Sequence, residues 1–518
     1  MTIGPLARVF RPGLRRSRRV SGRFAPFFSG FALAVWLALA FWPVASLEAR
    51  LPTRLEDESP REYWQFLFLY ERTTAAGQTE FILHPFYGRY TNEEKAYHYD
   101  NVLYPIWYSH GTNYWNKWTL LYFFTGDEYY HEDSEEDSDL FLTPFFSLGG
   151  GTADKERYFS IFPFYGRVRN KLGWSEIQFA MFPLYANWSH RDYQAQGLLW
   201  PLVMWGDSPT RDDLRILPFY SHKIHKGKYD RRTVLWPFIQ WGSEGLDKKE
   251  PRHFFFTFPF YGRKWSDAGQ LSAHTFLWLP FLGGMFAYGE DTATDAVSYN
   301  ALFFLYQYAR NTDPVNYKHI IFPFWGKYRF GTSEKDDEPY YKEMQFITPF
   351  YVNLNTRSAT LDSDYNIFVP IYWNDVRYFH KERESERYVK FWPFYQYISD
   401  SRGRTEMRSL ALWPFRSDQF ERNWGTLWSL FEWNQYENGD KYFATLFRMY
   451  SRYWNPELDT SHHFLLGFET HNTPEYWSVE FLGGFLGYRR NYPVSNLTGD
   501  VRPADVDGHV LRLLWLDL

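Results

Sequence analysis

The chain has 518 residues, and Phe, Trp and Tyr make up 22% of them, far above the share in ordinary globular proteins. Charged residues account for 23% and the mean hydropathy is -0.51, which excludes a bundle of apolar membrane helices. The net charge is -5, and no basic stripe follows the N-terminus, so we expect no nucleic-acid partner. Cysteine is absent, which excludes disulfides, thiolate metal sites and thiol nucleophiles.

The N-terminal segment is typical of an export signal. Residues 1–23 contain seven arginines and no acidic residue, and the apolar stretch 31–41 follows. Pro43 then precedes three small residues, as in a signal-peptide cleavage region. We therefore expect residues 1–49 to be a signal peptide, with an uncleaved membrane anchor as the alternative. Residues 50–60 are expected to be a linker, and residues 61–518 a single repetitive β domain.

A short apolar motif centred on proline recurs through the rest of the chain, as in Pro163-Phe164-Tyr165. Fifteen of the 29 prolines share this setting, and Phe follows eleven of them. Copies without proline, such as residues 121–124 and 303–306, fill the wider gaps, so that about 22 to 24 units cover residues 60–518. The fifteen prolines are Pro85, Pro105, Pro144, Pro163, Pro183, Pro201, Pro218, Pro237, Pro259, Pro280, Pro323, Pro349, Pro370, Pro393 and Pro414.

Each unit is predicted to be one β-strand of 10–13 residues with the proline near its middle. Aromatic and β-branched residues favour strands, and polar segments such as 226–228 and 399–403 separate the units. Asn438-Gly439 between two aromatic runs indicates a hairpin. A repeat of about 20 residues is too short for a parallel crossover. The sequence therefore predicts an all-β fold, a long antiparallel meander of about 22–24 repeated strands.

Closure into a large outer-membrane-type β-barrel is the predicted architecture of this meander. Open sheets rarely exceed about ten strands, and closure removes both edges. The alternating Leu514, Leu516 and Leu518 resemble the last strand of bacterial outer-membrane barrels, although those usually end in an aromatic residue. Two features oppose a barrel: apolar residues on both faces at mid-strand, and prolines that remove ladder hydrogen bonds. A layered sandwich or a propeller is the alternative.

Residues with obvious chemistry are few. No motif of a serine hydrolase, a zinc protease or a phosphate-binding loop is present. The acidic run around 127–139 is the best cation candidate, although a solvated loop explains it more simply. His462-His463 should point to opposite faces of a strand and so should not share a metal. No catalytic or cofactor-binding residue and no cofactor is predicted; the weak metal candidates are Asp133, Glu135, Asp137 and Asp139.

A basic residue follows the aromatic pair in several copies of the motif, namely Arg89, Arg167, Arg263 and Lys327. Such residues could line a polar constriction or bind anionic headgroups. The simpler interpretation places them at a membrane interface, where long basic side chains reach from apolar surroundings to water.

The sequence thus predicts a non-enzymatic protein exported to the outer membrane of a Gram-negative-type bacterium. We expect a pore, a conduit or a structural barrel, with membrane lipid as a partner and a hydrophobic small molecule as candidate cargo. The alternative is a soluble periplasmic or surface β-repeat protein that binds glycan or protein through aromatic faces. An enzyme such as a glycan hydrolase would need two carboxyl groups in one cleft, which spacing in the sequence does not reveal.

Overall fold

The computed structural model of the chain is one antiparallel sheet of 44 strands, with hydrogen-bonded pairs between strands that follow each other in the chain. The structure describes residues 62–517 except 76, 131–135, 143–144, 152–156, 170–172, 281, 313–314, 333–339 and 493–507. The predicted export signal and linker lie outside these residues. The predicted all-β antiparallel meander is confirmed.

The strands are short, and most of them have six residues. The first part of the sheet contains β1 (Glu62–Phe66), β2 (Tyr70–Ala75), β3 (Gln78–Leu83), β4 (Tyr87–Asn92), β5 (Tyr97–Val102), β6 (Trp107–Thr112), β7 (Trp115–Leu120), β8 (Phe124–Tyr130), β9 (Glu136–Leu142), β10 (Phe146–Gly151), β11 (Tyr158–Ile161), β12 (Tyr165–Arg169), β13 (Glu176–Ala180), β14 (Tyr185–His190) and β15 (Tyr193–Leu198). The second part contains β16 (Val203–Ser208), β17 (Arg211–Ile216), β18 (Tyr220–His225), β19 (Tyr229–Val234), β20 (Ile239–Glu244), β21 (Arg252–Thr257), β22 (Tyr261–Ser266), β23 (Leu271–Leu279), β24 (Gly283–Asp291), β25 (Ala296–Ala301), β26 (Tyr306–Asn311), β27 (Asn316–Ile321), β28 (Trp325–Gly331), β29 (Tyr341–Ile347) and β30 (Tyr351–Arg357).

The last part of the sheet is interrupted by one insertion. Its strands are β31 (Leu361–Phe368), β32 (Tyr372–Phe379), β33 (Glu384–Phe391), β34 (Tyr395–Asp400), β35 (Thr405–Ser409), β36 (Phe431–Gln435), β37 (Lys441–Thr445), β38 (Tyr450–Asn455), β39 (Thr460–Leu465), β40 (Phe468–Asn472), β41 (Tyr476–Phe481), β42 (Leu486–Asn491), β43 (Gly508–Leu513) and β44 (Leu516–Asp517). Between β35 and β36 the chain forms the helix α2 (Asp418–Trp424) and the short 3-10 turn η3 (Gly425–Leu427).

Thirteen of the fifteen proline motifs form turns, so the prediction that they lie in the middle of strands was wrong. Pro144 lies outside the described residues, and Pro414 lies in the insertion between β35 and β36. His84-Pro85-Phe86 joins β3 to β4, and Phe258-Pro259-Phe260 joins β21 to β22. Twelve of these X-Pro bonds are cis, as in tight turns with proline in third place. Each repeat is therefore a hairpin of two short strands, and 22 hairpins account for 44 strands instead of the predicted 22–24.

The band formed by these hairpins has two different edges. At one edge, which we name the proline rim, each odd-numbered strand turns into the next even-numbered one. At the other edge, the polar rim, the turns carry residues such as Glu94, Lys228 and Asp267. The predicted Asn438-Gly439 hairpin is confirmed and lies at the polar rim, with Gly439 at a φ of 84°.

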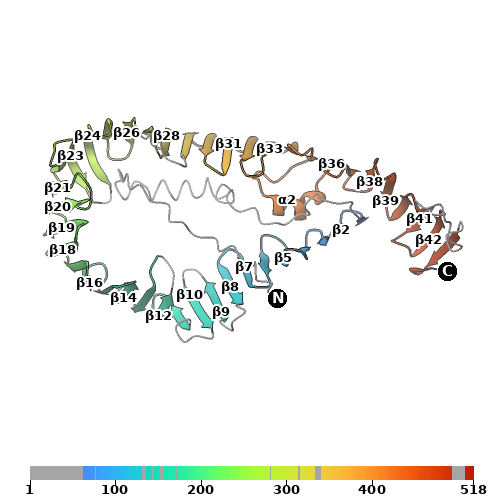
Figure 1. Cartoon of the computed structure of the whole chain (residues 1–518), viewed down its shortest axis with the longest axis horizontal. Coiled ribbons are helices and arrows are strands. Elements are labelled where there is room, and N and C mark those ends of the chain that lie inside the picture. The colour runs from blue at the N-terminus through green and yellow to red at the C-terminus, as the bar shows by residue number, and fades with distance from the viewer. Residues whose placement is uncertain are drawn as a thin grey trace, which may run out of the picture.

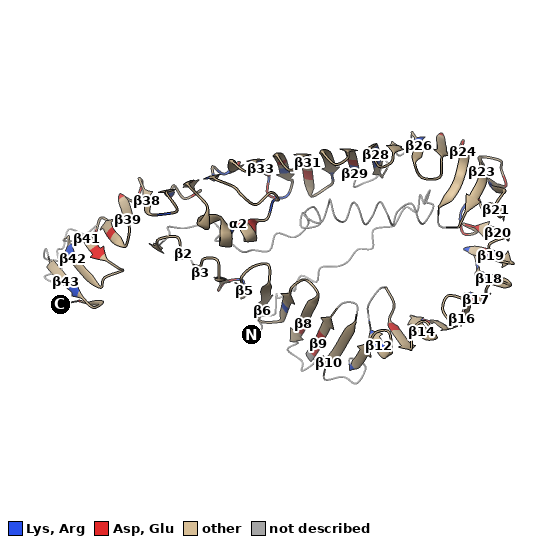
Figure 2. Ribbon diagram, turned by 180° about the vertical axis from the view of Figure 1, so that it is seen from behind, with Lys and Arg blue, Asp and Glu red and all other residues tan. Residues whose placement is uncertain are grey.

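The band curls into a long, flattened ring whose late strands extend past its first strands (Figure 1). Charged residues of both signs are distributed along the whole band (Figure 2). In the described part of the chain no strand pair joins β1 to a late strand, so the sheet is not closed. The predicted closure into a barrel is therefore not confirmed.

The first strands of the band meet a later part of it, around β36–β38, face to face instead of edge to edge, in a contact that we name the seam. The ring of Tyr63 in β1 stacks on that of Tyr453 in β38, with centroids 4.9 Å apart. Arg448, in the turn before β38, forms buried ion pairs with Glu71 of β2 and Glu432 of β36. Two parts of the sheet are therefore layered on each other at the seam.

The helix α2 lies inside the ring beside the seam (Figure 1). Ser417 caps its start by accepting a hydrogen bond from the Phe420 amide. The helix joins two distant parts of the band, because Glu421 pairs with Lys390 of β33 and Arg422 pairs with Glu80 of β3. In the described residues no helix is both long and apolar enough to cross a membrane.

One face of the sheet points into the ring. Because residues paired across neighbouring strands lie on the same face, the strand register identifies this inner face in every strand. It includes the residues that meet α2, such as Glu80 and Lys390. Because side chains alternate between faces, residues three and five positions after a turn proline lie on the inner face, as Gly262 and Lys264 do after Pro259. The same distances hold before the proline where the turn has three residues. The largest buried apolar cluster, which includes Met344 and Trp373, lies on this face in β27–β34.

Candidate functional site

Two of the four predicted cation ligands lie within the described residues. Asp133 and Glu135 lie outside the described residues, while Asp137 and Asp139 belong to β9. The Asp139 carboxylate accepts a hydrogen bond of 2.5 Å from the Tyr158 hydroxyl. In the part of the chain that the structure describes, no three His, Asp or Glu side chains are placed to hold a metal ion.

The other polar candidates lie where strand alternation predicts. His462 points into the ring and contacts His471 at 2.7 Å between their Nδ1 atoms, whereas His463 meets Tyr450 on the outer face. Arg89, Arg167, Arg263 and Lys327 also lie on the outer face, four residues after a turn proline. They therefore do not line the interior of the ring.

The strongest candidate site is the inner face at the bend of the ring, around β17–β27 (Figure 1). Two adjoining cavities lie here, of about 330 Å³ and about 700 Å³, and both are lined by Phe254, Phe256 and Lys264. Their sizes fall in the range of small-molecule binding sites. The predictions from the sequence did not include this site.

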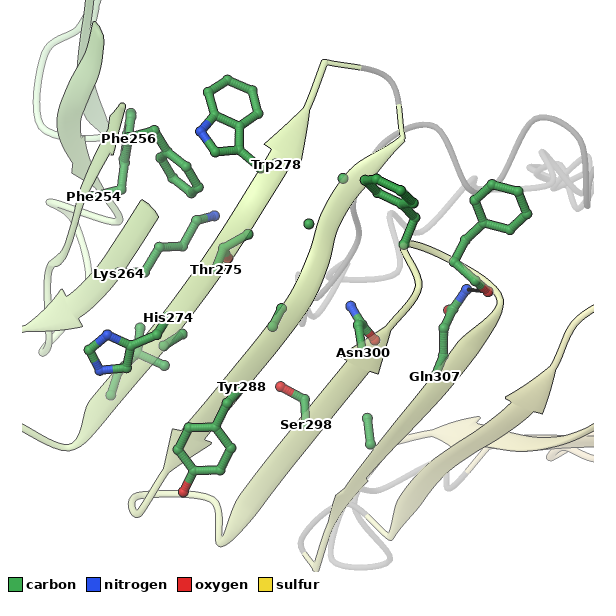
Figure 3. A pocket seen from close by; sticks show the side chains of 18 of the residues that line it. Phe254, Phe256, Lys264, His274, Thr275, Trp278, Tyr288, Ser298, Asn300 and Gln307 are labelled. Carbon is green, nitrogen blue, oxygen red and sulfur yellow. Dashed lines mark hydrogen bonds between the residues drawn. The ribbon is translucent and has the colours of Figure 1, made fainter. Parts of the chain in front are cut away.

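The wall of the larger cavity combines tryptophan and basic side chains. Trp236 lies in the turn of the proline rim, while Arg215 and Lys223 come from β17 and β18. In the smaller cavity, Lys264 extends over the sheet between Phe256 and Thr275, with Trp278 nearer the rim (Figure 3). Lys318 of β27 completes the lining of this cavity.

The carboxylates on this part of the inner face are already engaged. Asp213 accepts hydrogen bonds from Arg211 and from the Tyr193 hydroxyl, both at 2.6 Å to Oδ2. Two further carboxylates on this face, Glu244 and Asp291, form ion pairs with arginines. Arg231 pairs with Glu244 at 2.9 Å, and Arg252 pairs with Asp291 at 3.0 Å.

Four cations on the same surface have no such partner. Arg215, Lys223, Lys264 and Lys318 form neither an ion pair nor a hydrogen bond with any described residue. Arg215, Lys223 and Lys318 are half-buried, while Lys264 is exposed to the interior of the ring. The inner face at the bend therefore carries an excess of positive charge next to aromatic walls.

The surroundings of the three lysines lower their pKa values, mainly by desolvation. Burial and the neighbouring Arg215 lower the pKa of Lys223 to about 8. Desolvation by the surrounding sheet also lowers the pKa of Lys264, and burial lowers that of Lys318. Each lysine would be stabilised in its charged form by an anion bound beside it.

Register relative to the prolines was the signal that could have identified these lysines. Lys223 and Lys264 each lie five residues after a turn proline, and Lys318 lies five residues before Pro323. Once the proline is placed in a turn, all three positions fall on the inner face. Placing the proline in mid-strand hid this relationship.

Comparison with known proteins adds no assignment to this geometry. No family model matches the chain, and no curated protein sequence is significantly similar to it. The candidate site must therefore be interpreted from its own residues.

Proposed function

We propose that this protein is a non-enzymatic membrane protein of the cell envelope, with its proline rim inserted in one lipid leaflet and its ring holding or conducting hydrophobic cargo. The observation that carries the proposal is the row of exposed apolar side chains along that rim. Nine phenylalanines at this rim, each directly after a motif proline, have 53% to 69% of their surface exposed: Phe86, Phe145, Phe164, Phe219, Phe238, Phe260, Phe324, Phe350 and Phe394.

The apolar row continues through the turns that lack proline. Leu121, Phe123, Leu466 and Trp515 are all more than half exposed in such turns. Outside the insertion 410–430, the turns of this rim contain no Asp, Glu or Lys. Soluble monomers rarely expose apolar patches beyond a few hundred Å², and an extended row rimmed by polar residues is typical of an interaction surface.

The order of side chains on the outer face favours a membrane as the partner. Tyrosines follow the rim at two residues beyond the proline, as at Tyr165 and Tyr261. Basic residues come two positions further, as at Arg167 and Arg263. Apolar, aromatic and then basic groups follow one another in the same order at membrane–water interfaces.

The short strands favour insertion of one rim into a single leaflet over strands that cross the whole bilayer. Six residues extend about 20 Å, whereas the hydrocarbon core of a bilayer is about 30 Å thick. The turns of the polar rim carry charged residues such as Glu94 and Lys228, which would be costly to bury in lipid. We therefore place the proline rim in lipid and the polar rim in water.

The exposed rim is large enough to account for stable attachment. Transferring the exposed half of one phenylalanine from water into lipid contributes about 1 kcal/mol. Nine such residues together are comparable with one myristoyl chain, which by itself binds membranes only reversibly. The exposed leucines and isoleucines of the rim add the second contribution that stable attachment needs. The basic and apolar segment at the N-terminus supports export, and the outer membrane is the proposed location.

Vesicle flotation tests the proposal. The full chain should float with neutral phosphatidylcholine vesicles, and a combined variant with Phe86→Ser, Phe219→Ser, Phe260→Ser and Phe324→Ser should remain largely in the unbound fraction. A control with four Ser substitutions at the polar rim, at Glu94, Lys228, Asp267 and Arg402, should float normally. If the full chain does not float with the vesicles but binds immobilised glycan or protein, the result would support the soluble alternative instead.

A further inference from the structure

We infer that the basic inner face at the bend of the ring binds the anionic headgroup of an amphiphile, whose hydrocarbon chains extend toward the proline rim. This inference rests on the proposed function, because it names the class of cargo that such a ring would hold. Its evidence is separate, since it comes from the inner face and not from the rim.

The charge of the site points to an anionic ligand. Lys223, Lys264 and Lys318 lie at the same height on their strands, five residues from a turn proline. Arg215 lies one layer closer to the rim, three residues before Pro218. None of these four cations forms an ion pair or a hydrogen bond with a described residue, whereas Arg231 pairs with Glu244. Asp213, which lies opposite Lys223, is paired with Arg211 instead. A phosphate or carboxylate group would supply the missing charge through charge-assisted hydrogen bonds.

Along the strands, the lining of the site changes from aromatic beside the proline rim to basic further from it. A lipid presents its hydrocarbon chains and its headgroup in the same order. Trp236 and Trp278 lie beside the turns of the proline rim, and Phe256 lies three residues from Pro259. The lysine row comes next, with Lys264 paired by register with Phe254. A lipid with its headgroup at the lysines would place its chains against aromatic rings and point them at the inserted rim.

The cavities provide space for such a ligand. They have volumes of about 330 Å³ and 700 Å³ and share Phe254, Phe256, Lys264 and Glu244 in their walls. Glu244 is paired with Arg231 at 2.9 Å and forms no ion pair with Lys264, on which it acts only through its charge. An aromatic wall beside unpaired cations fits an amphiphile better than either a free inorganic anion or an uncharged hydrocarbon.

Isothermal titration of the full chain in a neutral detergent tests the inference. The probes are dihexanoyl phosphatidic acid, dihexanoyl phosphatidylcholine and inorganic phosphate, with both lipids below their micellar concentrations. We expect the phosphatidic acid to bind about tenfold or more tightly than either of the other two probes, because only it offers both a net negative headgroup and apolar chains.

Substitutions locate the binding at the lysine row. The double variant Lys223→Gln/Lys264→Gln should weaken phosphatidic acid binding by about tenfold or more, whereas Lys223→Arg/Lys264→Arg should retain it. The matched control Lys226→Gln/Lys228→Gln removes two lysines near the polar rim and should leave binding unchanged. Circular dichroism of each variant checks that the sheet is intact.

Two results would overturn the inference: unchanged binding in the Lys→Gln double variant, or equal binding of inorganic phosphate. Failure of the rim proposal is distinguishable from either result. In that case the four Phe→Ser substitutions would leave vesicle flotation intact, while titration with the soluble lipid would still report on the lysine row.

Discussion

The Tyr442 hydroxyl in β37 donates a hydrogen bond of 2.8 Å to the side-chain oxygen of Gln65 in β1. The two residues are 377 positions apart and both are buried. Their contact joins the start of the meander to a strand near its end through side chains, without strand pairing between them. The ring is therefore held by polar and aromatic contacts at the seam, together with the ion pairs of α2.

Arg448 is the residue whose loss should most affect the seam. Replacing it with Met would leave the buried Glu71 and Glu432 carboxylates without their cation, and removing one partner of a buried ion pair costs about 3–5 kcal/mol. We expect Arg448→Met to lower the midpoint of urea unfolding clearly. The triple variant that also carries Glu71→Leu and Glu432→Leu should recover much of the loss.

A control for this prediction is available on the surface. Arg402 pairs with Glu437 and Glu384 while half of its side chain is exposed. Arg402→Ala should therefore cost at most about 1 kcal/mol. Equal effects of Arg448→Met and Arg402→Ala on the urea midpoint would show that the seam does not depend on the buried pair.

His462 should make the stability of the late strands depend on pH. Burial, followed by the neighbouring His471 and His463, lowers the pKa of His462 to about 4, below its ordinary value of 6.5. Because the folded state disfavours the charged ring, this stabilisation is fully present above pH 6.5 and is lost as the pH falls toward 4. The expected loss is roughly 1–3 kcal/mol.

Unfolding midpoints of the wild type and of His462→Phe, measured between pH 7 and pH 4, check this prediction. The variant should show a flatter dependence over that range, since the titrating ring is gone. Parallel curves for the two proteins would mean that His462 is protonated as readily in the folded as in the unfolded chain.

A small residue three positions after the turn proline should matter where the neighbouring strand comes close. A Cβ atom added to Gly166 would lie 2.1 Å from the Cβ of Ser160 and 2.4 Å from its Cα. Since backbone cannot move aside cheaply, Gly166→Ala should cost about 1–3 kcal/mol.

The same position is occupied by Ala186 after Pro183, where the Cβ is accommodated in a buried site. Ala186→Gly should therefore cost only about 0.5–1 kcal/mol, mainly through chain entropy. Thermal unfolding of both variants distinguishes the two effects. If Gly166→Ala proved as mild as Ala186→Gly, the strand at Ser160 must be able to shift.

Strand chemistry and antiparallel neighbours were predictable from the sequence, because both depend on local composition and on the length of the repeat. The strand count was not, because apolar residues flank most of the turn prolines, as Phe162 and Phe164 flank Pro163. A turn with this composition has the same pattern as the interior of a strand. The exposed position of Phe164 breaks the usual rule that turns are polar.

The candidate site was missed for the same reason. Lys223 and Lys264 are separated by 41 residues, and only the hairpin register brings their side chains to one face and one height. The contacts at the seam could not be predicted from the sequence for a different reason. Contacts such as Tyr442 with Gln65 depend on the curvature accumulated over dozens of strands, which no local pattern encodes.

The central claim, that one rim of the band enters lipid and the other stays in water, can be measured at single positions because the chain has no cysteine. Phe260→Cys at the proline rim and Lys228→Cys at the polar rim would each carry an environment-sensitive fluorophore. On addition of phosphatidylcholine vesicles, we predict a blue shift and protection from an aqueous quencher at position 260 and neither effect at position 228. Equal protection at both positions, or at neither, would contradict one-sided insertion.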